Sequence, residues 1–62
     1  MKVSKLKQYL IQLGIGEGQA ESIMSTSSSY QDVIDQVRDY LNLINAPVER
    51  KIIKLKKFIH NG

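Results

Sequence analysis

The 62-residue chain contains no cysteine and no tryptophan, a single proline and four glycines. Without cysteine it forms neither a disulfide nor a thiolate metal site, the two supports that most often stabilise very small proteins. A chain of this length hides only about 60% of the surface that it exposes when unfolded, so its core is small and its stability is marginal. Helix packing, or association with a second copy as a homodimer, must therefore supply the stability.

Long apolar runs are also missing. The apolar residues, 42% of the chain, are dispersed among charged ones, and no run approaches the roughly 18 residues of a membrane-spanning helix. No apolar segment typical of a secretory signal follows the first lysine, Lys2. These absences predict a cytoplasmic protein with no transmembrane segment.

Residue types that perform catalysis are scarce. The single histidine, His60, has no second histidine or cysteine with which to complete a metal site or a nucleophile–base pair. Five hydroxyl residues occupy positions 25–29 without a basic partner, and they suit a loop that caps a helix. Asp32, Asp35 and Asp39 share one side of a predicted helix but lack the loop geometry of a calcium or magnesium site. The sequence therefore predicts a protein that is not an enzyme and that uses no cofactor and no metal.

Charge is distributed unevenly around the net value of +3. Residues 1–13 carry +3, residues 14–46 carry −4 and residues 47–62 carry +4. Basic ends around an acidic centre are typical of a basic face that binds phosphate or an anionic membrane. They are equally typical of elements whose charges complement one another within the fold.

Apolar residues recur at intervals of three and four along the chain, which predicts amphipathic helices and no strand. Gly14 ends the first helix, and Pro47 begins the last because proline suits a first helical turn. The expected helices span about residues 4–13, 17–25, 29–44 and 47–59. The whole chain, residues 1–62, is thus predicted to be one all-α domain, a compact bundle of four short helices.

The start of the third helix has two candidate caps. Ser28 with Gln31 has the spacing of a capping box, in which each side chain bonds the backbone of the other. Ser29 is a competing cap one residue later.

The last predicted helix is the strongest functional signal. Its apolar residues occupy one face, so it can pack on a core while its basic groups contact the phosphates of DNA. A helix of this kind also binds an anionic membrane surface, and an ordinary solvated face of a bundle helix has the same pattern. The candidate DNA-binding residues are Arg50, Lys51, Lys54 and Lys57, joined by Lys2 and Lys5 if the two terminal helices are neighbours.

Three glycines fall within five consecutive positions, 14–18, of the stretch LGIGEGQAESIM, residues 13–24. The simplest interpretation is a turn between two helices, in which Gly14 is left-handed, Ile15 packs back on the first helix and Gly16 starts the second. A nucleotide-binding glycine loop is disfavoured, because the GxGxxG spacing is absent and no strand precedes the glycines.

The same stretch resembles two DNA-binding motifs. Gly14-Ile15-Gly16, with Ala20 and Ile23 in the helix that follows, is similar to a helix-hairpin-helix. That resemblance implies that backbone amides of the turn bind a DNA phosphate. Leu13-Gly14-Ile15 with Ala20 and Ile23 also resembles a helix-turn-helix, which implies that the helix over 17–25 enters the major groove.

The run from Leu10 to Leu41 is similar to ubiquitin-associated-like three-helix domains. The similarity rests on the turn Leu13-Gly14-Ile15, on Ala20 six residues after the glycine, on the polar serine loop and on the branched residues of the third helix. It implies a protein-binding surface made by Gly14, Ile15, Gly16 and the third helix, with Ile15 exposed.

The leading hypothesis is a small DNA-associated accessory or regulatory protein that uses its basic terminal helices. The alternative is a protein–protein adaptor or inhibitor with the ubiquitin-associated-like surface. A domain that binds a membrane surface is the third class considered.

Overall fold

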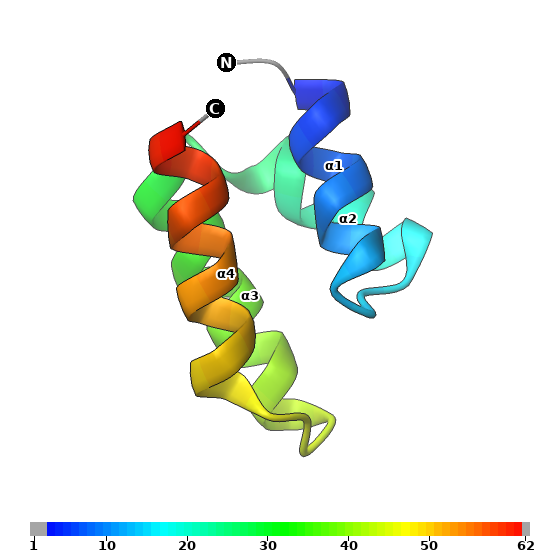
Figure 1. Cartoon of the computed structure of the whole chain (residues 1–62). Helices are drawn as coiled ribbons and strands as arrows, with labels where there is room; N and C mark the ends of the chain where they lie inside the picture. The colour runs from blue at the N-terminus through cyan, green and yellow to red at the C-terminus, as the bar shows by residue number, and fades with distance from the viewer. Residues whose placement is uncertain (1–2, 62) are drawn as a thin grey trace.

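The computed structural model describes residues 3–61, which form four α-helices joined by short turns (Figure 1). Each helix end lies within two residues of the predicted one, and residues 3–61 contain no strand. The prediction of an all-α bundle of four short helices is confirmed. The helices are α1 (Val3–Gln12), α2 (Glu17–Thr26), α3 (Tyr30–Leu43) and α4 (Val48–Asn61).

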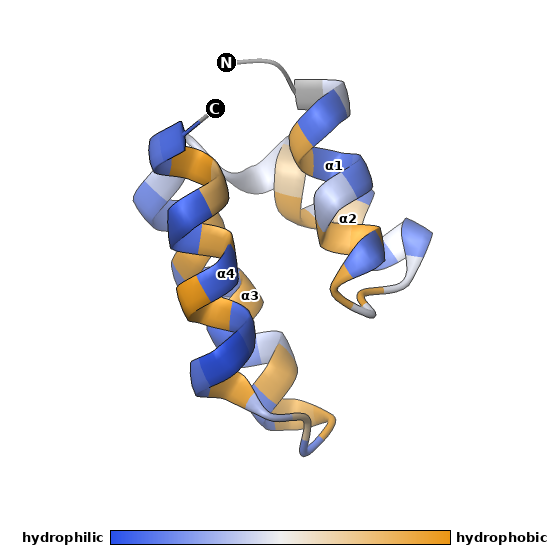
Figure 2. Ribbon diagram, viewed as in Figure 1, coloured by the Kyte–Doolittle hydropathy of each residue, from blue (hydrophilic) through white to orange (hydrophobic). Residues whose placement is uncertain are grey.

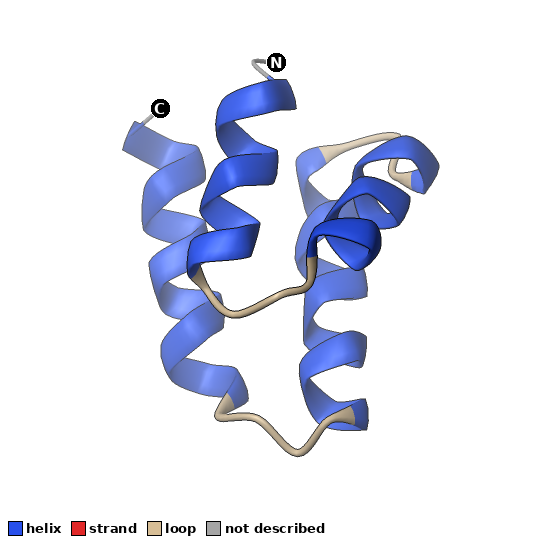
Figure 3. Ribbon diagram, turned by 90° about the vertical axis from the view of Figure 1, so that its right-hand side faces the viewer, coloured by secondary structure: helices blue, strands red, loops and turns tan. Residues whose placement is uncertain are grey.

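The four helices form a closed ring of neighbours. α1 packs on α2 and α4, and α3 likewise packs on α2 and α4. α4 runs antiparallel to both α1 and α3 (Figure 1), whereas α2 crosses the other helices obliquely (Figure 3). Because α1 and α4 close the ring, the two basic helices of the chain lie side by side.

Buried apolar residues from all four helices form one shared core, and Figure 2 shows apolar residues alternating with polar ones along the helices. No polar or charged residue is buried in the part of the chain that the structure describes. Within residues 3–61, no helix combines the length and the apolar character needed to cross a membrane. The buried residues are Leu6, Leu10, Leu13, Ile15, Ala20, Ile23, Met24, Val33, Ile34, Val37, Leu41, Ile52 and Leu55.

The glycine turn is a Schellman motif, the common C-terminal cap of a helix. Gly14 adopts φ +99°, its amide donates to the Ile11 carbonyl at 3.0 Å, and the Ile15 amide donates to the Leu10 carbonyl at 3.1 Å. The Ile15 side chain is only 1% exposed. The interpretation as an interhelical turn is therefore confirmed, and the expectation of an exposed Ile15 is wrong, because the motif folds this side chain back into the core.

A second left-handed residue ends α3. Asn45 has φ +57°, and the Ala46 amide donates to the Leu41 carbonyl at 2.9 Å. Asparagine tolerates this conformation better than most residues, so it replaces glycine at this cap. The chain then enters α4 directly after Pro47.

The cap of α3 is Ser29. Its hydroxyl accepts a hydrogen bond from the Asp32 amide at 3.2 Å, and the Asp32 carboxylate accepts bonds from the hydroxyl and the amide of Ser28. These two bonds from Ser28, the hydroxyl bond foremost, lower the pKa of Asp32. The predicted pair of Ser28 with Gln31 is wrong, because the Gln31 amide donates instead to Asp35 at 3.0 Å.

Candidate nucleic-acid interface

An aromatic contact joins the two terminal helices. The rings of Tyr9 on α1 and Phe58 on α4 are stacked, with centroids 4.3 Å apart and planes 7° from parallel. Offset or parallel stacking of this kind favours association beyond the buried area alone. The two terminal helices are therefore neighbours, as an extension of the basic surface of α4 by the N-terminal lysines requires.

Lys5 lies beside this contact. It lines a shallow groove of about 270 Å³ together with Tyr9 and Phe58, and Gln8 and Gln12 complete the lining. The exposed Lys5 side chain therefore adjoins the C-terminal half of α4. Lys2, the other N-terminal candidate, lies outside the described residues.

Three bases share the outer side of α4. Arg50, Lys54 and Lys57 stand at the i, i+4 and i+7 positions that fall on one helix face, and all three are exposed. The core side of the same helix holds Ile52 and Leu55. We call the surface formed by Lys5, Arg50, Lys54 and Lys57 the basic face.

Within the described part of the chain, no acidic residue forms an ion pair with the basic face. Within residues 3–61 the ion pairs are Lys7–Glu21 at 3.8 Å, between α1 and α2, and Arg38–Asp35 at 3.7 Å, within α3. Neither pair includes a residue of α4, so the charges of α4 do not pair with the acidic third helix in this part of the chain. Lys7 belongs to the α2 side of α1 and not to the basic face.

Lys51, a candidate DNA-binding residue in the sequence, does not lie on the basic face. Its side chain is half-buried, and its ammonium group donates to the carbonyl of Leu13 at the C-terminal end of α1. A cation is favourable there because the last carbonyls of a helix lack partners and carry partial negative charge. Lys51 thus fastens α4 to α1, and its ammonium group is not presented with the basic face.

The glycine turn offers little to a phosphate. The amides of Gly14 and Ile15 are occupied by α1 carbonyls, and the next free amides open α2, whose first turn contains Glu17. The Gly16 carbonyl accepts from the Ala20 amide at 2.8 Å. The residues Gly14, Ile15 and Gly16 therefore act as a structural connection between α1 and α2.

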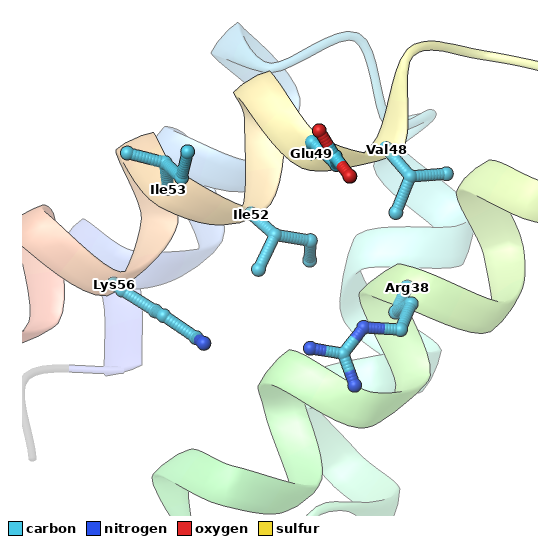
Figure 4. A pocket seen from close by; sticks show the side chains of 6 residues that line it. All are labelled: Arg38, Val48, Glu49, Ile52, Ile53 and Lys56. Atoms are coloured by element: carbon cyan, nitrogen blue, oxygen red, sulfur yellow. The ribbon is translucent and has the colours of Figure 1, made fainter.

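Sequence reasoning missed a second group of cations. Arg38 of α3 and Lys56 of α4 line a groove of about 230 Å³ between these two helices (Figure 4). Arg38 stands in an otherwise acidic segment, and only the packing of α3 on α4 brings it near Lys56. In the sequence, only its position as the single base of residues 14–46 distinguishes Arg38 as a candidate binding residue.

No protein-family model, no curated protein and no solved structure matches this chain. Among residues 3–61, no three histidine or acidic side chains gather as a metal ion would require.

Proposed function

We propose that this protein is a small, non-catalytic binding protein that associates with DNA through the basic face, as an accessory or regulatory component. The observation that carries the proposal is the Tyr9–Phe58 contact, because it brings Lys5 of α1 next to Phe58 of α4, the helix that carries the other bases of the face. The contact between α1 and α4 supports a single site built from the basic segments at the two ends of the sequence.

The charge arrangement supports a polyanionic partner. The bases of the face are exposed and form no ion pair within residues 3–61, whereas the acids other than Glu49 lie on α2 and α3. Each lysine or arginine that contacts a phosphate releases condensed counterions from DNA, which is the main source of sequence-independent affinity. Because these cations on α4 form no ion pair within residues 3–61, they can contact phosphates and release counterions without first breaking one.

The composition of the face favours backbone contacts over base recognition. Lysine ammonium groups act as point charges toward phosphate, and only Arg50 has the planar, forked geometry of a guanidinium. We therefore expect binding with weak sequence preference.

The test is the affinity of the protein for a short labelled DNA duplex, measured by fluorescence anisotropy at low salt. Lys54→Gln should weaken binding several-fold, because it removes a phosphate contact. Lys7→Gln is the matched control: it removes the same charge from a lysine that pairs with Glu21 at 3.8 Å, and it should leave the affinity nearly unchanged. Equal losses in the two variants, or no binding by the unaltered protein, would contradict the proposal.

A further inference from the structure

We infer that the groove between α3 and α4 is a docking site for a segment of a partner protein that carries an acidic side chain next to an aliphatic one. We call it the α3–α4 groove. Its lining residues are Arg38, Val48, Glu49, Ile52, Ile53 and Lys56.

The floor and one wall of the groove are aliphatic. All three aliphatic residues belong to α4: Ile52 is buried, Val48 is half-buried, and Ile53 is 52% exposed. A single exposed isoleucine is common on protein surfaces. Here, however, Ile53 adjoins two further branched side chains in a concave surface, so an apolar group that enters the groove meets apolar atoms on several sides.

Two cations border this aliphatic surface. Figure 4 shows the Arg38 and Lys56 side chains extending toward one another from α3 and α4, next to Ile52. Glu49 lies beside Val48. Two like charges that face a common space repel, and an anion placed between them is attracted by both, which outweighs the repulsion.

The existing partner of Arg38 does not prevent this. Asp35 lies 3.7 Å away, and both side chains are about half exposed, at 43% and 54%. Ion pairs with such exposure contribute little, so the guanidinium can exchange Asp35 for an incoming carboxylate and bind it with two parallel hydrogen bonds. Asp35 is not part of the groove lining.

Size and chemistry together indicate the class of partner. A volume of about 230 Å³ is below the 300 to 1,000 Å³ typical of small-molecule sites, but it accommodates one or two side chains of a protein. A nucleic-acid backbone supplies an anion but no aliphatic group for Val48, Ile52 and Ile53. A protein segment with a glutamate or aspartate beside a leucine or isoleucine supplies both.

The site is separate from the basic face, so this inference does not depend on DNA binding. Lys56 and the basic face lie on different sides of α4, and Lys5 adjoins Phe58 while Arg38 adjoins Lys56. The protein can therefore hold a nucleic acid on one side and an acidic protein segment on the other.

The experiment is a titration of the full-length ¹⁵N-labelled chain with the synthetic peptide acetyl-Ser-Leu-Glu-Glu-Leu-Ser-amide, followed by NMR. We expect the backbone signals of Ile52 and Ile53 and the Arg38 side-chain Nε signal to shift. Arg38→Gln and Lys56→Gln should each weaken peptide binding about fivefold, whereas Lys54→Gln, a loss of the same charge from the basic face, should not. All three positions are on the surface, and circular dichroism verifies that each variant is folded.

Two altered peptides and a DNA duplex complete the test. Replacing both glutamates by glutamine, or both leucines by serine, should abolish the shifts, because the site requires an anion and an aliphatic group together. The inference is overturned if the peptide shifts signals of the basic face instead, if the serine peptide binds as well as the leucine peptide, or if no shift occurs. It is also overturned if a short duplex, and not the peptide, shifts Ile52, Ile53 and Arg38.

Discussion

The ring of Tyr9 lies flat against the ring of Phe58, with the centroids 4.3 Å apart. This contact joins the first helix to the last and brings Lys5 next to α4. The two residues are 49 positions apart in the sequence, so the basic face exists only in the folded chain.

The Tyr9–Phe58 contact should be measurable as a coupling energy. In a double-mutant cycle with Tyr9→Leu and Phe58→Leu, we expect the two changes to be non-additive by about 0.5–1.5 kcal/mol in the free energy of unfolding. Leu43, which is exposed at 80% at the far end of α3, provides the control: Leu43→Ala and Phe58→Leu should be additive. Additivity of the Tyr9 and Phe58 changes would show that the stack does not hold α1 to α4.

Lys51 and Lys54 are three residues apart on α4, but removal of their charges should have different effects. Lys51→Met keeps the aliphatic stem and leaves the Leu13 carbonyl without its donor, which should cost about 1–2 kcal/mol of stability. Lys54→Met changes an exposed side chain and should alter stability by less than about 0.5 kcal/mol. Chemical denaturation of both variants tests this, and equal stabilities would contradict a fastening role for Lys51.

Gly14 and Gly18 should respond in opposite directions to alanine. Gly14 has φ +99°, and an added Cβ would lie 2.9 Å from the Lys51 Nζ, so Gly14→Ala should destabilise the protein by about 1–2 kcal/mol. Gly18 lies inside α2, and a Cβ there meets nothing within 4 Å. Gly18 is in the first turn, so Gly18→Ala should stabilise the protein modestly, by up to about 0.5 kcal/mol. Thermal unfolding of the two variants is the measurement, and a neutral Gly14→Ala would argue against the left-handed cap.

Asp32 should make stability depend on pH. Hydrogen bonds from Ser28 lower its pKa in the folded state, so folding favours the charged carboxylate. This stabilisation is present at neutral pH and disappears as the pH falls below about 4 and through the lowered pKa. The stability difference between the unaltered protein and Asp32→Asn should thus shrink on acidification.

Ser28→Ala removes the hydroxyl bond that contributes most to the lowered pKa of Asp32. It should therefore give a stability difference with the same dependence on pH. Denaturation curves between neutral and acidic pH test both variants, and a difference that does not change with pH would contradict this role of Ser28.

The helices and most of the core could be predicted from the sequence because both depend on local periodicity. Leu10, Val37 and Leu55 each belong to a series of apolar residues spaced three and four positions apart within its own helix, and all three are buried. The turn at Gly14 was also recognisable, since a glycine after an amphipathic helix is the usual C-terminal cap.

The parts that could not be predicted depend on which helices become neighbours. Lys51 and Lys54 look alike in the sequence, and only the position of α1 makes one a helix cap and leaves the other exposed. Arg38 and Lys56 are 18 residues apart, and their convergence follows from the antiparallel packing of α3 on α4. The burial of Ile15 likewise depends on how the Schellman motif directs its side chain.

DNA binding by the basic face is tested most directly by the salt dependence of duplex affinity. Each phosphate contact contributes about −0.9 to the slope of log Kobs against log salt concentration, so the four bases of the face predict a slope of about −3.6. In the triple variant Arg50→Gln, Lys54→Gln, Lys57→Gln, where Lys5 alone remains, the slope should fall to about −0.9. A slope near zero in the unaltered protein, or the same slope in both proteins, would contradict the proposed interface.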